Sequence, residues 1–473
     1  MTSSDDLAGT VATHRSRKQL GAWYTPPDLV DLVVEHVVTR ERFGSHTARP
    51  VRVLDPACGD ARFLEATAAR LELLGVACRL VGVDIDAAAG AAARRRCPEA
   101  TIIVADALDR DWREGPFDLV IGNPPFLSQL AAATARGGAS ARGGGPYADV
   151  AVEFLALAAE LVAPDGRVSL VLPRSVLSAR DAGPVRRSID RRASMHWSWS
   201  SDDKLFEAEV LICVVSHDFG GRRAVGTGAG DSWGSVITAA RGIPEVPVEI
   251  DVAGTFTDRA RLNANFRDEY YGMIPGVGDH DVGPPLITSG LIDPGVSTWE
   301  ARPVTFAKRR FRAPRIDVDA LDDQMQRWAV QRLVPKVLIA NQTAIVEAVC
   351  DPLGEWLPGV PVVAAYPCDG SAETAWEIAA VLTSPVPSAW AWHRSAGTGL
   401  SAGTIRLGPA LLADLPWPRG DLSHAVRSLR AGDVRTCARR VDAAYGITDD
   451  SELLTWWSAS LDRIERRRHR MTT

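Results

Sequence analysis

The sequence predicts a doubly wound α/β sheet in the first half of the chain, followed by a second, mixed α/β domain. Short apolar stretches of strand composition alternate with helix-like stretches up to about residue 173, as in a parallel sheet with crossover helices. This alternation stops near residue 220, where the chain becomes rich in glycine. The expected organisation is a flexible lead-in over 1–18, a first domain over 19–225, a second domain over 226–420 and a helical C-terminal tail over 421–473.

Composition agrees with this division and excludes several classes of protein. A chain of 473 residues is longer than one compact core usually requires. The seven cysteines are scattered without Cys-x-x-Cys spacing, so neither a zinc site nor a disulfide framework is expected. The N-terminus is polar and no apolar run could span a bilayer, which favours a cytoplasmic protein without membrane attachment. The net charge of -6 argues against a nucleic-acid-coating protein but permits a local basic cleft.

The first predicted element is a helix that begins close to Thr25. Thr25 is suited to cap it, Pro26 fits the first helical position, and Asp28 lies in the first turn. The apolar residues over 29–38 recur at helical spacing, which supports the prediction.

The predicted sheet carries a polar side chain at the end of each of its first four strands. Strands are expected over 51–54, 80–86, 101–104, 117–121, 167–173 and 206–217. Helices are expected over about 62–74, 87–96 and 147–161, with a turn over 163–166. Ligands of such sheets bind beyond the carboxyl ends of the strands. The polar side chains at those ends belong to Asp55, Asp84, Asp106 and Asn123.

The stretch Asn123-Pro124-Pro125-Phe126 is the sequence around which the candidate site is organised. Proline donates no backbone hydrogen bond and biases the preceding residue toward extended geometry. The stretch is therefore a stiff arch that projects one amide side chain and one bare carbonyl beside an aromatic ring. Two acceptors next to a flat apolar surface suit a planar substrate that carries an NH2 group. Taken alone, the stretch is equally compatible with an ordinary Pro-Pro turn.

The turn over 55–61 indicates the kind of cofactor. It has neither the glycine pattern of a dinucleotide fold nor the Gly-Lys-Ser/Thr of a P-loop, so phosphate binding is not expected. Small residues framed by Asp55 and Asp60 suit a cationic or amino-acid group, whereas Asp84 could accept from ribose hydroxyls and Asp106 from an adenine amine. Each acid alone is more often a cap or turn former. Together they fit S-adenosyl-L-methionine.

Several motifs follow one another in an order that identifies a family. They are Gly21-Ala22-Trp23-Tyr24-Thr25-Pro26, Asp55-Pro56-Ala57-Cys58-Gly59, Asp84, Asp106, Asn123-Pro124-Pro125-Phe126, and Tyr147-Ala148-Asp149. In this order they resemble the gamma-class, TaqI-like DNA adenine-N6 methyltransferases, whose sheet is a Rossmann-like S-adenosylmethionine-dependent methyltransferase fold. The segments 335–342 and 403–418 look like the target-recognition domain of that family.

The resemblance implies roles for individual residues. It implies that the cofactor is bound by Tyr24, Thr25, Asp55, Ala57, Cys58, Gly59, Asp84, Ile85, Asp106, Ala107 and Asn123. It also implies that the side chain of Asn123 and the carbonyl of Pro124 accept hydrogen bonds from the N6 amine of a flipped adenine. Phe126 and Phe206 would stack on the two faces of that base, although Phe206 fits a core position equally well.

Two features depart from the family pattern. The family usually has glycine where this chain has Ala61, a change that is tolerable at negative φ but costs stability at positive φ. The loop over 128–146, rich in Gly, Ala, Ser and Arg, is the second. It fits either a disordered insertion or a lid that orders on the substrate, and the composition does not separate these.

A basic segment in the second half is the candidate for contact with DNA phosphates. Between residues 302 and 315 the chain has six basic residues, two aromatic residues and no acid. The residues expected to touch DNA are Lys308, Arg309, Arg310, Arg312 and Arg315. A solvated basic loop would have the same composition.

The resemblance implies site-specific methylation of double-stranded DNA at adenine N6, in a bacterial restriction–modification or related defence setting. The protein is expected to be a monomer, with a separately encoded restriction endonuclease as a candidate partner. One alternative is methylation of a protein glutamine, because that family shares the Asn-Pro-Pro arch, although it generally lacks the roughly 250 residues that follow here. The other is a non-catalytic DNA-binding protein with a decayed cofactor site, which only Ala61 supports.

Overall fold

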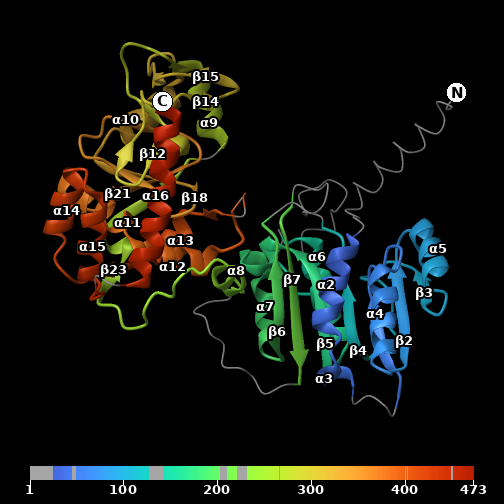
Figure 1. Ribbon diagram of the computed structural model, residues 1–473. Coiled ribbons are helices and arrows are strands. Elements are labelled where there is room, and N and C mark those ends of the chain that lie inside the picture. The colour runs from blue at the N-terminus through green and yellow to red at the C-terminus, as the bar shows by residue number, and fades with distance from the viewer. Residues whose placement is uncertain are drawn as a thin grey trace. The chain divides into compact units, whose positions relative to one another are not determined.

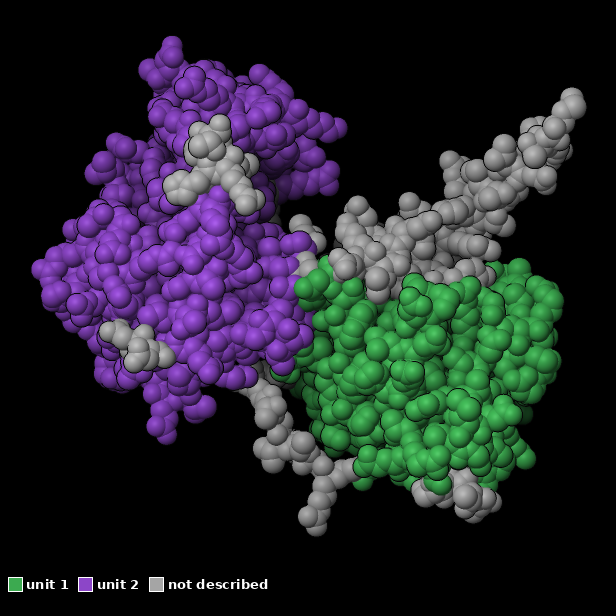
Figure 2. Space-filling model, in the orientation of Figure 1, with its two compact units in different colours: residues 1–236 green, residues 237–473 purple. Residues whose placement is uncertain are grey.

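The computed structural model describes residues 25–44, 49–126, 142–145, 148–202, 210–220, 232–265, 267–399, 401, 403–448 and 451–472. The chain divides into two compact units, residues 1–236 and 237–473 (Figure 1, Figure 2). The expected boundary at 225/226 falls in the segment 221–231, outside the described residues, and stays a prediction. Within the described part of the chain, no helix is both long and apolar enough to cross a membrane.

Unit 1 is built on one seven-stranded sheet with the order β3-β2-β1-β4-β5-β7-β6. The strands are β1 Val51–Asp55, β2 Cys78–Asp84, β3 Thr101–Val104, β4 Phe117–Gly122, β5 Val162–Pro173, β6 Ala193–Ser200 and β7 Ile212–Phe219. β7 runs antiparallel to both of its neighbours, whereas the strands from β3 to β5 pair in parallel. β4 is buried along its whole length, as expected for a strand covered on both faces. The predicted Rossmann-like α/β sheet is confirmed.

Helices cover this sheet. They are α2 Pro27–Val37, α3 Arg40–Phe43, α4 Arg62–Leu73, α5 Ala87–Arg96, α6 Val150–Leu161 and α7 Gly183–Asp190, with short 3-10 helices η1 Arg174–Leu177 and η2 Arg180–Ala182. α2 packs beside α4, and both lie in front of the sheet in Figure 1; α6 packs beside α7. The apolar faces of these helices close the core of unit 1, so the strand ends are held in a rigid frame.

Two predictions for unit 1 were wrong, and one strand was not predicted. α2 begins at Pro27 with Pro26 as its N-cap, so Thr25 does not cap the helix. The expected turn over 163–166 belongs to β5, because Val162 already pairs with Phe117 before a register shift in the β4–β5 ladder. The sequence also did not reveal β6, whose alternating Ser, His and Trp residues contain few of the aliphatic side chains that mark buried strands.

Unit 2 centres on a four-stranded sheet with the order β19-β17-β21-β9, in which every pairing is antiparallel. Its strands are β9 Ala260–Ala264, β17 Lys336–Ala340, β19 Ala348–Asp351 and β21 Val362–Pro367. The second unit is therefore mixed α/β, as predicted.

Shorter strands and helices surround that sheet. The strands are β8 Val252–Thr255, β10 Val277–Gly278, β11 Leu286–Ile287, β12 Ile292–Asp293, β13 Val296–Ser297, β14 Val304–Phe306, β15 Arg309–Phe311, β16 Arg315–Ile316, β18 Gln342–Thr343, β20 Leu357–Pro358, β22 Ile405–Arg406 and β23 Pro416–Pro418. The helices are α8 Ser235–Ala240, α9 Arg267–Met273, α10 Asp323–Arg332, α11 Ala372–Leu382, α12 Pro385–Ser395, α13 Pro409–Ala413, α14 Ser423–Arg430, α15 Val434–Ala444 and α16 Glu452–Thr472.

The last three helices, expected as a tail, pack into unit 2. α14 lies against α11 and α15, and α16 lies against α12. Trp457 on α16 is fully buried and shares a hydrophobic cluster with Leu461, Ala438 of α15 and Ile345. A fully buried tryptophan side chain contributes on the order of a few kcal/mol to the free energy of unfolding, so α14, α15 and α16 belong to the core of unit 2.

Candidate active site

The carboxyl ends of β1, β2 and β4 meet at one edge of the sheet, because β1 pairs in parallel with both neighbours. The turn after β1 is fastened to the end of β2. Asp84 accepts a hydrogen bond of 2.8 Å from the amide of Gly59 and another of 2.8 Å from the amide of Asp86. Gly59 has φ 54°, a left-handed conformation that glycine adopts without steric cost. Asp84, the last residue of β2, therefore also holds the turn after β1 in place.

Asp55 is a buried acid without a cationic partner among the described residues. It is 2 % exposed and accepts a 3.1 Å hydrogen bond from the amide of Ala57. Burial raises the pKa of Asp55 to about 8, and burial also raises the pKa of Asp84. A positively charged ligand beside these groups would favour their ionised forms, so the two acids suit the cationic end of a ligand.

Gly122, the last residue of β4, brings the chain against Asp55. A Cβ atom at this position would lie 2.3 Å from Oδ1 of Asp55 and 2.8 Å from its carboxyl carbon. Only glycine fits such an approach, and the residue that follows is Asn123. The contact therefore fixes the distance between the acid of the turn and the arch, a restraint that the sequence analysis did not identify.

Asp60, the other acid of the turn, is occupied by arginines. Its Oδ2 accepts from Nε of Arg62 at 3.0 Å and from Arg96 at 3.1 Å. Arg62 also donates to the carbonyl oxygen of Thr25 at 3.1 Å, linking the turn to the segment before α2. The expectation that Asp60 frames a cationic ligand was wrong, because two guanidinium groups already neutralise it.

Ala61 adopts the positive-φ backbone conformation that costs stability in a residue other than glycine. Its φ is 67° and its ψ is 26°, in the left-handed region, and it is the N-cap of α4. A non-glycine residue there costs on the order of 1–2 kcal/mol. The departure from the family pattern at this position is therefore a real strain in the turn that carries Asp55 and Gly59.

Replacing Ala61 by glycine should relieve that strain. Part of the gain is offset by the greater unfolded-state freedom of glycine and by the lost buried methyl group, so we expect a rise of about 0.5 kcal/mol in the free energy of unfolding. Denaturant unfolding measures it. The matched variant is Ala93→Gly, since Ala93 is equally buried but lies within α5, where glycine should cost about 1 kcal/mol. Equal losses at both positions would contradict the account of Ala61.

The arch after β4 is held by a side-chain hydrogen bond to the segment before α2. Nδ2 of Asn123 donates to Oγ1 of Thr25 over 3.0 Å. This bond fixes the plane of the amide, so the direction of its carbonyl oxygen is set by the fold. Pro124 is buried and Phe126 is 9 % exposed. The ring next to the arch is thus largely covered.

The remaining expected cofactor residues lie around the same edge. Ile85 is 58 % exposed directly after Asp84, and such an apolar side chain suits the face of a heterocycle. Asp106 accepts from the amide of Leu108 over 2.9 Å. Ala107 is buried, as is Cys58, whose thiol has a pKa raised by burial and therefore stays neutral. Tyr24, Tyr147, Phe206 and most of the 128–146 loop lie outside the described residues.

In unit 2 the basic segment forms a β-hairpin from β14 and β15 (Figure 1). Phe306 and Phe311 anchor it in a hydrophobic cluster, at 3 % and 5 % exposure. The outward side chains are Lys308, Arg309, Arg310 and Arg312, all exposed. Arg315 is instead held by a 2.7 Å hydrogen bond to the carbonyl of Gly283 and lies over the ring of Trp299. Four of the five expected DNA-contacting side chains are therefore available to a ligand.

The tip of this hairpin is strained. Ala307 and Lys308 both have positive φ, 48° and 63°, as in the two-residue turns that usually contain Asn-Gly. The amide of Ala307 donates to the hydroxyl of Tyr270 over 3.0 Å, which helps to hold the turn. Strain of this kind concentrates at functional positions, and here it presents Lys308 at the tip.

Residues 10–196 match the family model for the N-6 DNA methylases. This part of the chain is similar to the N-6 DNA methylases. The match covers the turn after β1, the acid of β2 and the arch after β4. The predicted family, the DNA adenine-N6 methyltransferases, is confirmed, whereas its gamma-class subdivision stays a prediction.

The chain is similar in sequence to one viral and one bacterial methyltransferase. The chain is 31 % identical over 115 residues to the type II methyltransferase M.CvrRI of Paramecium bursaria Chlorella virus XZ-6E, covering 24 % of this chain and 27 % of that protein. It is 38 % identical over 112 residues to the type II methyltransferase M.TthHB8I of Thermus thermophilus, covering 24 % and 22 %. The matches thus span about a quarter of each relative.

One solved structure resembles the chain along most of its length. The type IIG restriction endonuclease BpuSI matches with a TM-score of 0.41 and 12 % identity, covering 96 % of this chain and 66 % of that one.

Proposed function

We propose that this protein transfers a methyl group from S-adenosyl-L-methionine to the N6 amine of adenine in double-stranded DNA, as a gamma-class enzyme. The observation that carries the proposal is the position of Asn123. Its amide is fixed by Thr25 and follows the glycine that lies against the buried Asp55. The group that would hold the substrate amine is thus built next to the acids that suit the cofactor.

The residues at the strand ends fit this cofactor. Asp55 is a buried acid without a cationic partner among the described side chains, and the positively charged methionine end would favour its ionised form. Asp84 retains acceptor capacity for ribose hydroxyls beyond its two backbone hydrogen bonds, and the exposed Ile85 suits the adenine face. When bound, the cofactor supplies an electrophilic methyl group.

The arch supplies what the substrate amine needs. The lone pair of the adenine N6 amine is delocalised into the ring, so the amine is a poor nucleophile. Acceptors on its two N–H bonds, Oδ1 of Asn123 and the carbonyl of Pro124, favour a pyramidal nitrogen whose lone pair is available. Because these acceptors are fixed by Pro124, Pro125 and Thr25, they stabilise the transition state without reorganisation. Once the nitrogen carries the methyl group it is cationic and loses one proton to water, so no strong base is required, and S-adenosyl-L-homocysteine is the second product.

A duplex adenine must leave the stack to reach the arch, at a cost of about a few kcal/mol. Phe126 is the proposed stacking surface on one face of the flipped base, and Phe206 on the other. Since Phe126 is 9 % exposed, the base would have to displace some of the atoms that now cover the ring. Unit 2 is proposed to recognise the DNA sequence.

We propose that the β14–β15 hairpin contacts the DNA phosphates. Arg309→Gln together with Arg310→Gln should weaken DNA binding and lower the slope of log affinity against log salt by about 2, since each phosphate contact contributes about 0.9. Fluorescence anisotropy over a salt series measures this. The matched control removes two exposed charges elsewhere in unit 2, Arg439→Gln with Arg440→Gln. A slope that falls equally in both variants would argue against a local contact.

The proposed setting is bacterial restriction–modification or a related defence system in the cytoplasm. A restriction endonuclease encoded separately is the proposed partner, and the protein is proposed to act as a monomer. Methylation of a protein glutamine would use the same arch but would leave unit 2, with its exposed basic hairpin, without a role. Sequencing N6-methyladenine in DNA from cells that express the protein tests the proposal. Methylated adenines in one recurring sequence are expected, and DNA with no new N6-methyladenine would contradict it.

A further inference from the structure

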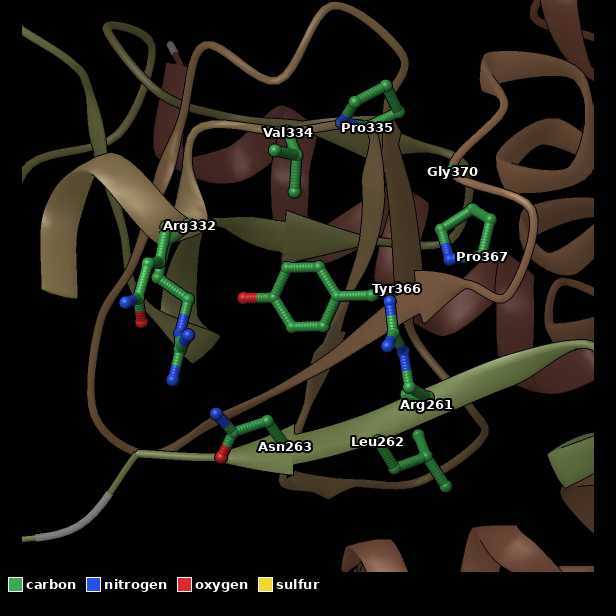
Figure 3. A pocket seen from close by; sticks show the side chains of 10 residues that line it. Arg261, Leu262, Asn263, Arg332, Val334, Pro335, Tyr366, Pro367 and Gly370 are labelled. Carbon is green, nitrogen blue, oxygen red and sulfur yellow. The ribbon is translucent and has the colours of Figure 1, made fainter.

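Unit 2 contains a cavity of about 530 Å³ that the proposed reaction does not use. It lies between β9, β21 and the end of α10, and Figure 3 shows the ring of Tyr366 pointing into it. Arg261 and Asn263 from β9 and Arg332 from α10 line it together with Tyr366. The volume falls within the range of small-molecule sites, about 300–1,000 Å³.

Three hydrogen-bond donors at this cavity are buried without an acceptor among the described residues. They are the hydroxyl of Tyr366, Nε of Arg332 and, next to the guanidinium, Nε1 of Trp328. The guanidinium of Arg332 lies 5.8 Å from the ring centre of Tyr366 and 5.9 Å from that of Trp328. Buried donors without acceptors are costly, so their concentration here points to an acceptor-rich ligand.

The charge of the cavity is positive. No Asp or Glu lines it, and neither Arg261 nor Arg332 forms an ion pair with any described residue. Burial raises the pKa of Tyr366 to about 12, so the phenol keeps its proton and acts as a donor near neutral pH. Guanidinium groups match phosphate geometry with paired hydrogen bonds. Asn263 adds an amide that can both donate and accept.

We propose that this cavity binds a nucleoside phosphate. Arg332, Arg261 and the hydroxyl of Tyr366 hold the phosphate, whereas Asn263 contacts the planar base. The nucleotide is either free in solution, as a phosphomonoester, or part of a DNA strand, as a phosphodiester, since both present anionic phosphate oxygens. The site is separate from the arch of unit 1, and binding requires neither the methyl donor nor Asn123.

The test uses thymidine 5′-monophosphate, which lacks the adenine that a methyl-donor site would recognise. Its binding to the full-length protein is measured by calorimetry, with thymidine as the phosphate-free control, and the affinity for duplex DNA is measured in parallel. The variants are Arg332→Gln and the milder Tyr366→Phe, which removes only the hydroxyl. The control is Arg327→Gln, an exposed arginine of α10 that does not line the cavity.

We expect Arg332→Gln to weaken binding about tenfold or more and Tyr366→Phe about threefold, with Arg327→Gln unchanged. If these variants lose affinity for thymidine 5′-monophosphate, the cavity binds a free nucleotide. If they lose affinity for duplex DNA alone, the cavity binds a nucleotide of the DNA strand. Unchanged affinities of both ligands in Arg332→Gln and Tyr366→Phe would overturn it. All measurements are repeated in Asn123→Ala without methyl donor, so failure of methyl transfer leaves this test intact.

Discussion

Replacing Asn123 by alanine should lower the rate of methyl transfer at least about 10²-fold, because the variant loses an acceptor that is fixed toward the transition state. Its effect should be larger on kcat than on binding of the methyl donor, because Asn123 is only one of the expected cofactor-binding residues and Asp55 and Asp84 are untouched. Single-turnover transfer of a labelled methyl group measures the rate, and calorimetry measures the binding of S-adenosyl-L-methionine.

The matched variant for this prediction is Thr25→Val. It keeps the volume of the side chain but removes the hydroxyl that accepts from Nδ2 of Asn123 over 3.0 Å. A positioning role predicts a smaller loss of kcat, about tenfold, and a loss that is not additive with Asn123→Ala. If Asn123→Ala retained a rate near that of the wild type, Asn123 would have no part in the chemistry.

Gly122→Ala should also lower both stability and the rate of methyl transfer strongly, because it disturbs the contact with Asp55 and not because it removes a reactive group. The new Cβ atom would lie 2.3 Å from Oδ1 of Asp55, so either the carboxylate or the end of β4 must move. Overpacking of this kind costs about 1–3 kcal/mol of stability. Because Asn123 follows directly, a displacement of about 1 Å there can reduce the rate about 10²-fold. Denaturant unfolding and the transfer assay measure the two effects.

The control for Gly122→Ala is Gly408→Ala. A Cβ atom at Gly408 meets no atom within 4 Å, and its φ of -135° suits any residue. This variant should change stability by less than about 0.5 kcal/mol and leave methyl transfer unchanged. Similar losses at both glycines would mean that the close approach to Asp55 is not what makes Gly122 necessary.

The alternating pattern of strands and helices was enough to predict the sheet of unit 1. β1 to β4 are short, apolar and bounded by turns, and parallel pairing then requires their polar end residues to share an edge. Asp55, Asp84 and Asn123 could therefore be grouped from the sequence alone. β6 could not be found, because an edge strand is half solvated and its residues need not be aliphatic.

The details of the site depend on backbone angles and hydrogen-bond partners that cannot be predicted from sequence motifs. The sequence offered two outcomes for Ala61, and the left-handed φ of 67° decides between them. Thr25 looked like a helix cap, but Pro26 takes that position and the hydroxyl of Thr25 serves Asn123 instead. Asp60 had the right spacing for a ligand, but Arg62 and Arg96 reach it through the fold. Such competition between local and tertiary partners is settled only by packing.

In unit 2 the sequence identified the basic segment but not its form. The two aromatic residues among the cations proved to be the anchors of a hairpin, so Phe306 and Phe311 are unavailable for stacking on bases. The cavity around Tyr366 could not be predicted at all. Its residues come from β9, α10 and β21. β9 and β21 are far apart in the sequence and meet through antiparallel pairing, and α10 lies between them in the chain.

Transfer of a methyl group to adenine N6 can be followed with an isotope-labelled methyl donor. Purified protein is incubated with unmethylated duplex DNA and methyl-deuterated S-adenosyl-L-methionine, and the DNA is digested to nucleosides for mass spectrometry. We expect label in N6-methyldeoxyadenosine, and at least about 10²-fold less of it with Asn123→Ala. Label in a methylated cytosine, or in a protein glutamine with none in DNA, would contradict it.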